Sequence, residues 1–104
     1  MSHVWITTSD GDLLRADQIR QINVVEGLRV VTTSGSQFLV ADIEGRQAAL
    51  TAARDLASAM AEAETWPWAA EIDVVSDGGG WTVRAVAMGD AGAAQERQWE
   101  RTTV

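Results

Sequence analysis

Two short segments combine acidic residues with glycine, as loops that bind metal ions or phosphate groups do. Residues 10–12 read DGD and residues 77–80 read DGGG, so both offer carboxylate oxygens, the ligands that Ca²⁺ and Mg²⁺ prefer. A calcium loop continues with further acidic ligands at regular spacing, whereas Asp12 is followed by two leucines. A phosphate loop opens onto a helix and carries a lysine, which this chain lacks. We therefore interpret both segments as hairpin turns and expect neither a metal nor a cofactor.

Side chains for nucleophilic or acid–base catalysis are scarce. His3 is the only imidazole, so a Ser-His-Asp site would have to be built at the start of the chain. A glycosidase-like pair of carboxylates needs a deep cleft, which a small domain seldom encloses. The sequence therefore predicts a protein that is not an enzyme. The alternative is a small-ligand-binding or hydrolytic protein that uses acidic residues in a shallow pocket. That pocket would be lined by Asp12, Asp73 or Glu71, together with Trp81.

Tryptophan is the residue type that most suggests a binding surface. The chain has five tryptophans but only one phenylalanine and no tyrosine. Trp66 and Trp68 flank Pro67, the only proline, and residues two apart in an extended segment point the same way. The two indoles would then form a flat apolar patch, suited to a partner protein or to a second copy of the chain.

The alternative is that tryptophan supplies most of the aromatic bulk of the core. In that case Trp5 and Trp81 fill the core of a sheet, and one of the two indoles beside Pro67 closes the end of a helix over it. A combined interpretation places one indole inside and one at an interface. The resulting interface candidates are Trp66, Pro67, Trp68 and Trp99.

The net charge of −7 argues against binding to nucleic acid. A chain of this sign repels phosphate, and its arginines do not gather on one face. An anion-mimicking inhibitor of the kind that phages use is a further alternative, and it requires most of the fifteen acids to lie on one face. Acids spread along a chain are instead typical of a solvated surface.

Composition also bears on compartment and source. No apolar run approaches the roughly 20 residues that span a bilayer, and the first residues lack the basic and apolar segments of a secretory signal. The sequence therefore predicts a cytoplasmic protein with no membrane partner. Because the chain has no cysteine, disulfides and thiolate metal sites are excluded. The use of arginine without lysine, with much alanine, indicates a GC-rich bacterial or phage genome.

Residues 1–43 have the pattern of a four-stranded antiparallel meander. Short runs of β-branched and aromatic residues alternate with turn residues, such as Asp-Gly at residues 10–11. The spacing of Ile19 and Ile22 breaks strict alternation, which predicts a bulge or bend near residues 16–18. The predicted strands cover residues 3–9, 13–26, 27–35 and 36–43.

Residues 46–64 change to a helical period. Apolar residues recur every three or four positions, while most charged residues, Asp55 among them, lie on other faces. Asp42 or Glu44 would lie near the start of the helix and favour its dipole, and Pro67 ends the helix at about Glu64. The predicted apolar stripe consists of Ala49, Ala53, Leu56, Met60 and Ala63, flanked by Leu50 and Ala57.

Residues 69–88 read as a β-hairpin that turns at residues 77–80. Its apolar side is predicted to carry Ile72, Val74, Trp81, Val83 and Ala85. Residues 89–104 are either a seventh strand or a frayed helix that starts at Asp90. The glycine-rich segment at residues 89–92 would return the chain antiparallel to the hairpin, which favours the strand.

Residues 6–43 resemble the FlbD type of small bacterial flagellar or swarming protein. The matching pieces are the Asp-Gly turn at residues 10–11, the segment at residues 16–22 and the Gly-x-x-Phe-x-Val pattern at residues 35–40. The chain departs from the family in having Ala16 where asparagine is usual, and in continuing past the helix with a hairpin and a tail. The resemblance implies a small cytoplasmic regulatory or assembly protein without catalytic residues.

Together these patterns predict a single α+β domain over residues 1–104, with the helix packed on the sheet of the first 43 residues and the hairpin extending or covering it. The predicted role is non-catalytic and consists of protein–protein interaction or self-assembly. A homodimer would form through a sheet edge or through the tryptophan segment at residues 66–68.

Overall fold

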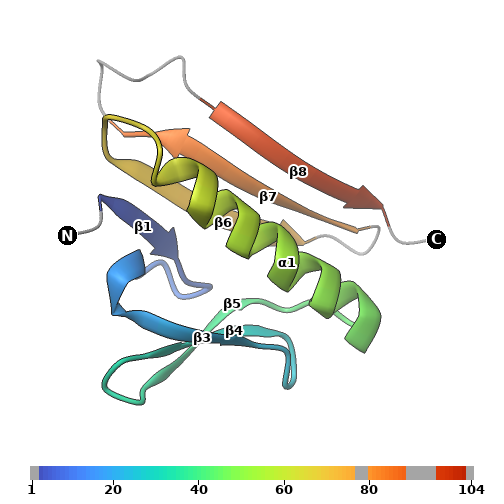
Figure 1. Ribbon diagram of the computed structural model, residues 1–104. Coiled ribbons are helices and arrows are strands. Elements are labelled where there is room, and N and C mark those ends of the chain that lie inside the picture. The colour runs from blue at the N-terminus through green and yellow to red at the C-terminus, as the bar shows by residue number, and fades with distance from the viewer. Residues whose placement is uncertain (1–2, 77–79, 89–95, 103–104) are drawn as a thin grey trace.

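The computed structural model describes residues 3–76, 80–88 and 96–102, and in these ranges the chain forms eight strands, one α-helix and a short 3₁₀ turn (Figure 1). The strands are β1 Val4–Thr7, β2 Leu13–Arg15, β3 Ile19–Asn23, β4 Leu28–Thr32, β5 Gln37–Ala41, β6 Ala70–Ser76, β7 Gly80–Ala87 and β8 Glu96–Thr102. The 3₁₀ turn η1 covers Ala16–Gln18, and the helix α1 covers Arg46–Ala63. The α+β class predicted from the sequence is confirmed.

The strands form two sheets rather than one meander. The larger sheet has the order β2-β1-β6-β7-β8, in which β1 runs parallel to β6 and the other neighbours are antiparallel. The smaller sheet is β3-β4-β5, all antiparallel. The predicted four-stranded meander over residues 1–43 is therefore wrong, because β1 and β2 leave the other three strands and join the C-terminal strands.

The bend predicted near residues 16–18 is the point at which the two sheets separate. The 3₁₀ turn η1 lies there, with Ala16 buried, and Gln18 accepts a backbone hydrogen bond from Thr33 N at 2.8 Å. The register of β3 against β4 also shifts between Ile19 and Gln21. A strand of residues 13–26 cannot continue through this turn, so β2 and β3 belong to different sheets.

The helix prediction of residues 46–64 is confirmed to within one residue. Glu64 N still donates to Met60 O at 3.1 Å, and Trp66 N donates to Ala63 O at 3.1 Å, after which Pro67 has no N–H to continue the pattern. The buried face consists of Ala49, Ala52, Asp55, Leu56, Ala59 and Ala63. No helix in the described residues is both long and apolar enough to cross a membrane.

The predicted apolar stripe of the helix is rotated from the real one. Ala57 is exposed, whereas Asp55, placed on a polar face by its charge, is only 5% exposed. The cause is the alanine content, because small residues on several sides of a helix hardly distinguish one face from another. Packing against β6 and β7 then decides which side is buried.

The helix α1 packs mainly on β6 and β7 of the C-terminal hairpin rather than on a sheet of the first 43 residues alone. Figure 1 shows α1 lying along the larger sheet, over β6 and β7. The predicted covering of an early meander by the helix is therefore corrected. Fully buried side chains from both sheets and the helix make up one cluster, including Val4, Ile6, Leu28, Val30, Leu56, Ile72 and Val83.

The hairpin prediction of residues 69–88 and the choice of a strand for the tail are both confirmed. β6 pairs with β7 from Ala70↔Ala87 to Ser76↔Trp81, and β8 pairs antiparallel with β7. The turn predicted at residues 77–80 and the glycine-rich segment at residues 89–92 lie largely outside the described residues.

The helix offers a direct test of this packing. Replacing Leu56, which is 0% exposed, by alanine should lower the free energy of unfolding by about 3 kcal/mol, because the change leaves a cavity. Leu50→Ala in the same helix should cost less than about 1 kcal/mol, because Leu50 is outside the core cluster. Urea denaturation measures both. Equal losses would contradict the orientation of α1 described here.

A second test compares Gly27, in the turn between β3 and β4, with Gly35, in the turn between β4 and β5. Gly27 and Gly35 both have positive φ, but a Cβ on Gly27 would lie 3.0 Å from Ala41 O and 3.0 Å from Leu39 Cδ1, whereas nothing lies within 4 Å of one on Gly35. Gly35→Ala should cost about 1 kcal/mol through backbone strain alone. Gly27→Ala should cost roughly 1–3 kcal/mol more, because it adds a clash. Thermal and urea unfolding of the pair would show whether the difference exists.

Candidate interaction surface

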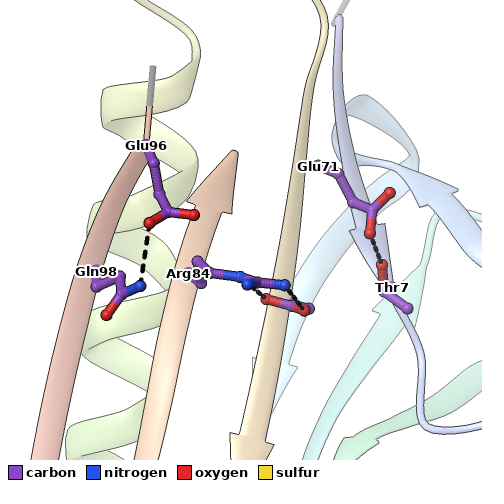
Figure 2. Close-up of polar contacts among 6 residues, drawn as sticks. Thr7, Glu71, Arg84, Glu96 and Gln98 are labelled. Atoms are coloured by element: carbon purple, nitrogen blue, oxygen red, sulfur yellow. Dashed lines mark hydrogen bonds and ion pairs between the residues drawn. The ribbon is translucent and has the colours of Figure 1, made fainter. Parts of the chain in front are cut away.

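In the described part of the chain, one face of the larger sheet carries no helix, and we call it the open face. Side chains alternate across a strand, so residues between the core positions of β1, β6, β7 and β8 point away from α1. Figure 2 views this face with the helix behind the strands. Its residues are Trp5, Thr7, Glu71, Asp73, Val75, Thr82, Arg84, Val86, Glu96 and Gln98.

A shallow hollow of about 250 Å³ lies on the open face, near the end of β7. It is lined by Glu71, Asp73, Arg84, Val86, Ala87, Met88 and Glu96. Small-molecule sites are usually larger, roughly 300–1,000 Å³, and enclose most of the ligand. The hollow is therefore better suited to a side chain of another protein than to a buried substrate.

Arg84 lies at the centre of the hollow and pairs with Asp73 on the neighbouring strand. Its Nε donates to Asp73 Oδ1 at 3.3 Å and its Nη2 to Asp73 Oδ2 at 3.0 Å, as the two dashed lines in Figure 2 show. The hydrogen bond and charge of Asp73, with smaller contributions from Glu96 and Glu71, raise the pKa of Arg84 above its ordinary value. The guanidinium is therefore a permanent positive charge surrounded by carboxylates.

The two glutamates on either side of Arg84 are bonded to neutral groups. Glu71 Oε2 accepts a hydrogen bond from Thr7 Oγ1 at 3.1 Å, and Glu96 Oε2 accepts one from Gln98 Nε2 at 3.1 Å. Figure 2 shows the two carboxylates on opposite sides of Arg84. Among the described residues, neither glutamate has a cation within ion-pair distance. The hollow therefore carries an excess of negative charge.

The outer edge of β8 is a second candidate surface. β8 pairs only with β7 in the described sheet, so its other side has no neighbouring strand. Met88 N donates to Ala69 O at 2.8 Å. Hydrogen-bonding direction alternates along a strand, so the even-numbered residues of β7 direct their backbone groups at β6 and the odd-numbered residues direct theirs at β8. With the unbroken β7–β8 register, Arg97 and Trp99 direct their backbone groups at β7, whereas Glu96 and Gln98 direct theirs at the free edge.

The structure separates the four tryptophan-segment and tail candidates. Trp66 is 7% exposed and belongs to the core cluster, and Trp68 is half-buried against that cluster. Pro67 is exposed. The flat patch of two indoles therefore does not form, because Trp66, shortly after the end of α1, is buried in the core. Trp99 is half-buried on β8, with the Arg97 guanidinium carbon 5.1 Å from its ring centre.

Trp5 and Trp81 lie on opposite faces of the larger sheet. Trp81 is 5% exposed on the helix side, as the core interpretation predicts. Trp5 alternates with the buried Val4 and Ile6, so it lies on the open face. The prediction that both fill the core is therefore correct only for Trp81.

The pocket expected for an enzyme does not form from its four residues. Glu71 and Asp73 share the hollow, but Trp81 lies on the opposite face, and Asp12 is exposed in the β1–β2 turn. His3 Nε2 donates to Ala63 O at 3.2 Å, at the end of the helix. In the ranges that the structure describes, no three His, Asp or Glu side chains gather closely enough to hold a metal ion.

A larger hollow of about 360 Å³ lies at the start of α1 but is unsuited to an anion. Helix N-termini favour negative ligands, yet Glu26, Asp42 and Glu44 line this hollow, with Arg46 as the one basic lining residue. The expectation that Asp42 or Glu44 lies near the helix start is confirmed. Neither caps it, because Gly45 occupies the N-cap position without a side-chain bond.

The sequence predictions did not include Arg84 or Glu96 as site residues, although the sequence contains a signal for the open face. The signal is the alternation of charged and apolar residues along β6, β7 and β8, as in Glu71-Ile72-Asp73. The alternation alone does not show that these charged residues lie side by side, because that depends on the register between the strands. Neither a protein-family model nor a curated protein nor a solved structure matches the chain.

The Arg84–Asp73 pair allows a test of how solvated the open face is. The Arg84 side chain is 45% exposed, so a double-mutant cycle with Arg84→Gln and Asp73→Asn should give a coupling below about 1 kcal/mol. The coupling should fall further at high salt, because exposed charges are screened. A salt-independent coupling above about 2 kcal/mol would mean that this face is covered in solution.

Proposed function

We propose that the chain is a non-catalytic interaction protein that self-associates through the outer edge of β8. The observation that supports this proposal is the edge itself: β8 covers Glu96–Thr102, and no strand of the described chain pairs with its outer side. An exposed row of backbone N–H and C=O groups is a template for another strand. The opposite edge is less suitable, because β2 has three residues and leads directly into η1.

A second copy of the chain is the partner that fits this edge best. Two β8 strands related by a two-fold axis run antiparallel, which closes the assembly at two chains and joins both five-stranded sheets into one. Both copies then contribute the same backbone pattern, with Glu96 and Gln98 directed at the shared edge. This arrangement agrees with the homodimer and the sheet-edge contact predicted from the sequence.

Trp99 sets the preferred register of the pairing. Its backbone groups point at β7, so at a β8–β8 interface it occupies a non-hydrogen-bonded position, where opposite side chains approach most closely. A register centred on Trp99 places the two indoles directly opposite one another. Cross-strand aromatic pairs of this kind contribute roughly 0.2–1 kcal/mol.

The wider biological role follows from the resemblance of residues 6–43 to FlbD-type proteins. It favours a small cytoplasmic bacterial protein that regulates or assembles through contacts with other proteins. The charge of −7 supports a partner other than nucleic acid. The hollow on the open face is smaller than usual substrate sites and does not favour a hydrolytic role. An anion mimic is not favoured either, since the described acids lie both at the open face and at the start of α1.

The proposal is tested by Gln98→Pro. Proline lacks the N–H that Gln98 directs at the free edge, but it leaves the β7–β8 hydrogen bonds in place, because those come from the neighbouring residues. Light scattering should give twice the mass of one chain for the native protein and the mass of one chain for the variant. Circular dichroism should show the fold unchanged.

Gln98→Ala is the matched control, since it removes the side chain and its bond to Glu96 but keeps the N–H. It should remain dimeric. Two results would contradict the proposal: a native protein that is monomeric at all concentrations, or a dimer that survives Gln98→Pro unchanged.

A further inference from the structure

The open face has an apolar part that the described chain leaves uncovered. Val75 is 58% exposed and Met88 is 37% exposed, and Val86 lies half-buried among the charged residues of the hollow. The helix α1, the one α-helix among the described residues, packs on the other side of the sheet (Figure 1). Exposed apolar groups beside a polar rim are typical of a surface that receives a partner.

The register of the strands arranges this face in a row. Trp5, Glu71, Val86 and Glu96 lie at neighbouring positions on β1, β6, β7 and β8. Because adjacent strands are about 4.8 Å apart, the row spans roughly 14 Å. It combines an aromatic ring, two carboxylates that form no ion pair with a described residue, and an aliphatic centre. A cation with an aliphatic stem is complementary to all of these groups.

We propose that the open face binds an extended segment of another protein that carries arginine or lysine. Glu71 and Glu96 would each receive a cationic group, Trp5 would offer its ring to the cation beside Glu71, and Val86 and Met88 would contact the aliphatic stems. Arg84 does not compete for the two glutamates, because its guanidinium is engaged by Asp73.

Other occupants are less complementary to the charges. Anionic lipids and nucleic acids would be repelled by the carboxylates of Glu71 and Glu96 and by the overall charge of −7. A second copy of the same face would bring Glu71 and Glu96 against glutamates of its own kind. Arg15 lies near Trp5 by register, but it is paired with Asp17 at 2.7 Å and does not neutralise the row.

The binding surface is separate from the β8 edge, so the two proposals fail independently. The side chains of the open face point out of the sheet, whereas strand pairing uses the backbone within its plane. The monomeric Gln98→Pro variant should therefore still bind the segment.

The probe is a short synthetic peptide that alternates arginine with threonine, compared with the same peptide carrying neutral citrulline in place of arginine. Titration calorimetry should show saturable binding of the arginine peptide only. Amide NMR signals should shift at Trp5, Glu71, Arg84 and Val86 and not along α1. The double variant Glu71→Gln, Glu96→Gln should weaken binding about tenfold, because it removes both carboxylates at constant shape.

The matched control is Asp42→Asn, Glu44→Gln, which changes the net charge equally at the hollow beside α1. It should weaken binding less than about twofold, because distant exposed charges are screened. Equal weakening by both variants would mean unspecific attraction and would overturn the proposal. It would also be overturned by equal binding of the citrulline peptide, by no saturable binding, or by shifts of the same amides with the concentration of the monomeric Gln98→Pro variant alone, which would assign the face to a second copy.

Discussion

β1 lies parallel to β6, although the whole of the smaller sheet and α1 lie between them in the chain. Parallel neighbours cannot be joined by a tight turn, so the chain needs a long crossover, and here the crossover contains both the three-stranded sheet and the helix. Ala70 N donates to His3 O at 3.0 Å at one end of this pairing, and Val4 and Ile6 are fully buried beside it. This contact fixes where the crossover that contains β3, β4, β5 and α1 begins and ends.

The crossover returns across one face of the larger sheet, and alanine lets it lie close. Ala52 and Ala59 have no exposed surface, and Leu56 supplies most of the bulk of the helix face. Trp66, shortly after the end of the helix, is buried in the core, and Pro67 then stops the backbone pattern. Since the described chain has one helix and it covers one face, the other face of the sheet is left to charged and half-buried side chains.

Strand alternation converts this one-sided covering into electrostatics. Val83 and Ala85 point into the core, so Arg84 must point out, and the register of three strands brings Asp73, Glu71 and Glu96 around it. Glu71 and Glu96 come from segments far apart in the sequence. Their common surface exists only because β6, β7 and β8 are consecutive in one sheet.

Local patterns in the sequence determined the elements of this protein. The three- and four-residue spacing of residues 46–64, the stop at Pro67 and the two-residue alternation of the hairpin each act over a few neighbours, and the helix, β6, β7 and β8 were predicted from them. The bend near Ala16 was also visible, because Ile19 and Ile22 break the alternation. Only the tertiary structure decided that β1 pairs with β6, that Asp55 faces inward and that Trp5 faces outward. These outcomes depend on contacts between distant segments, whose energies no local spacing records.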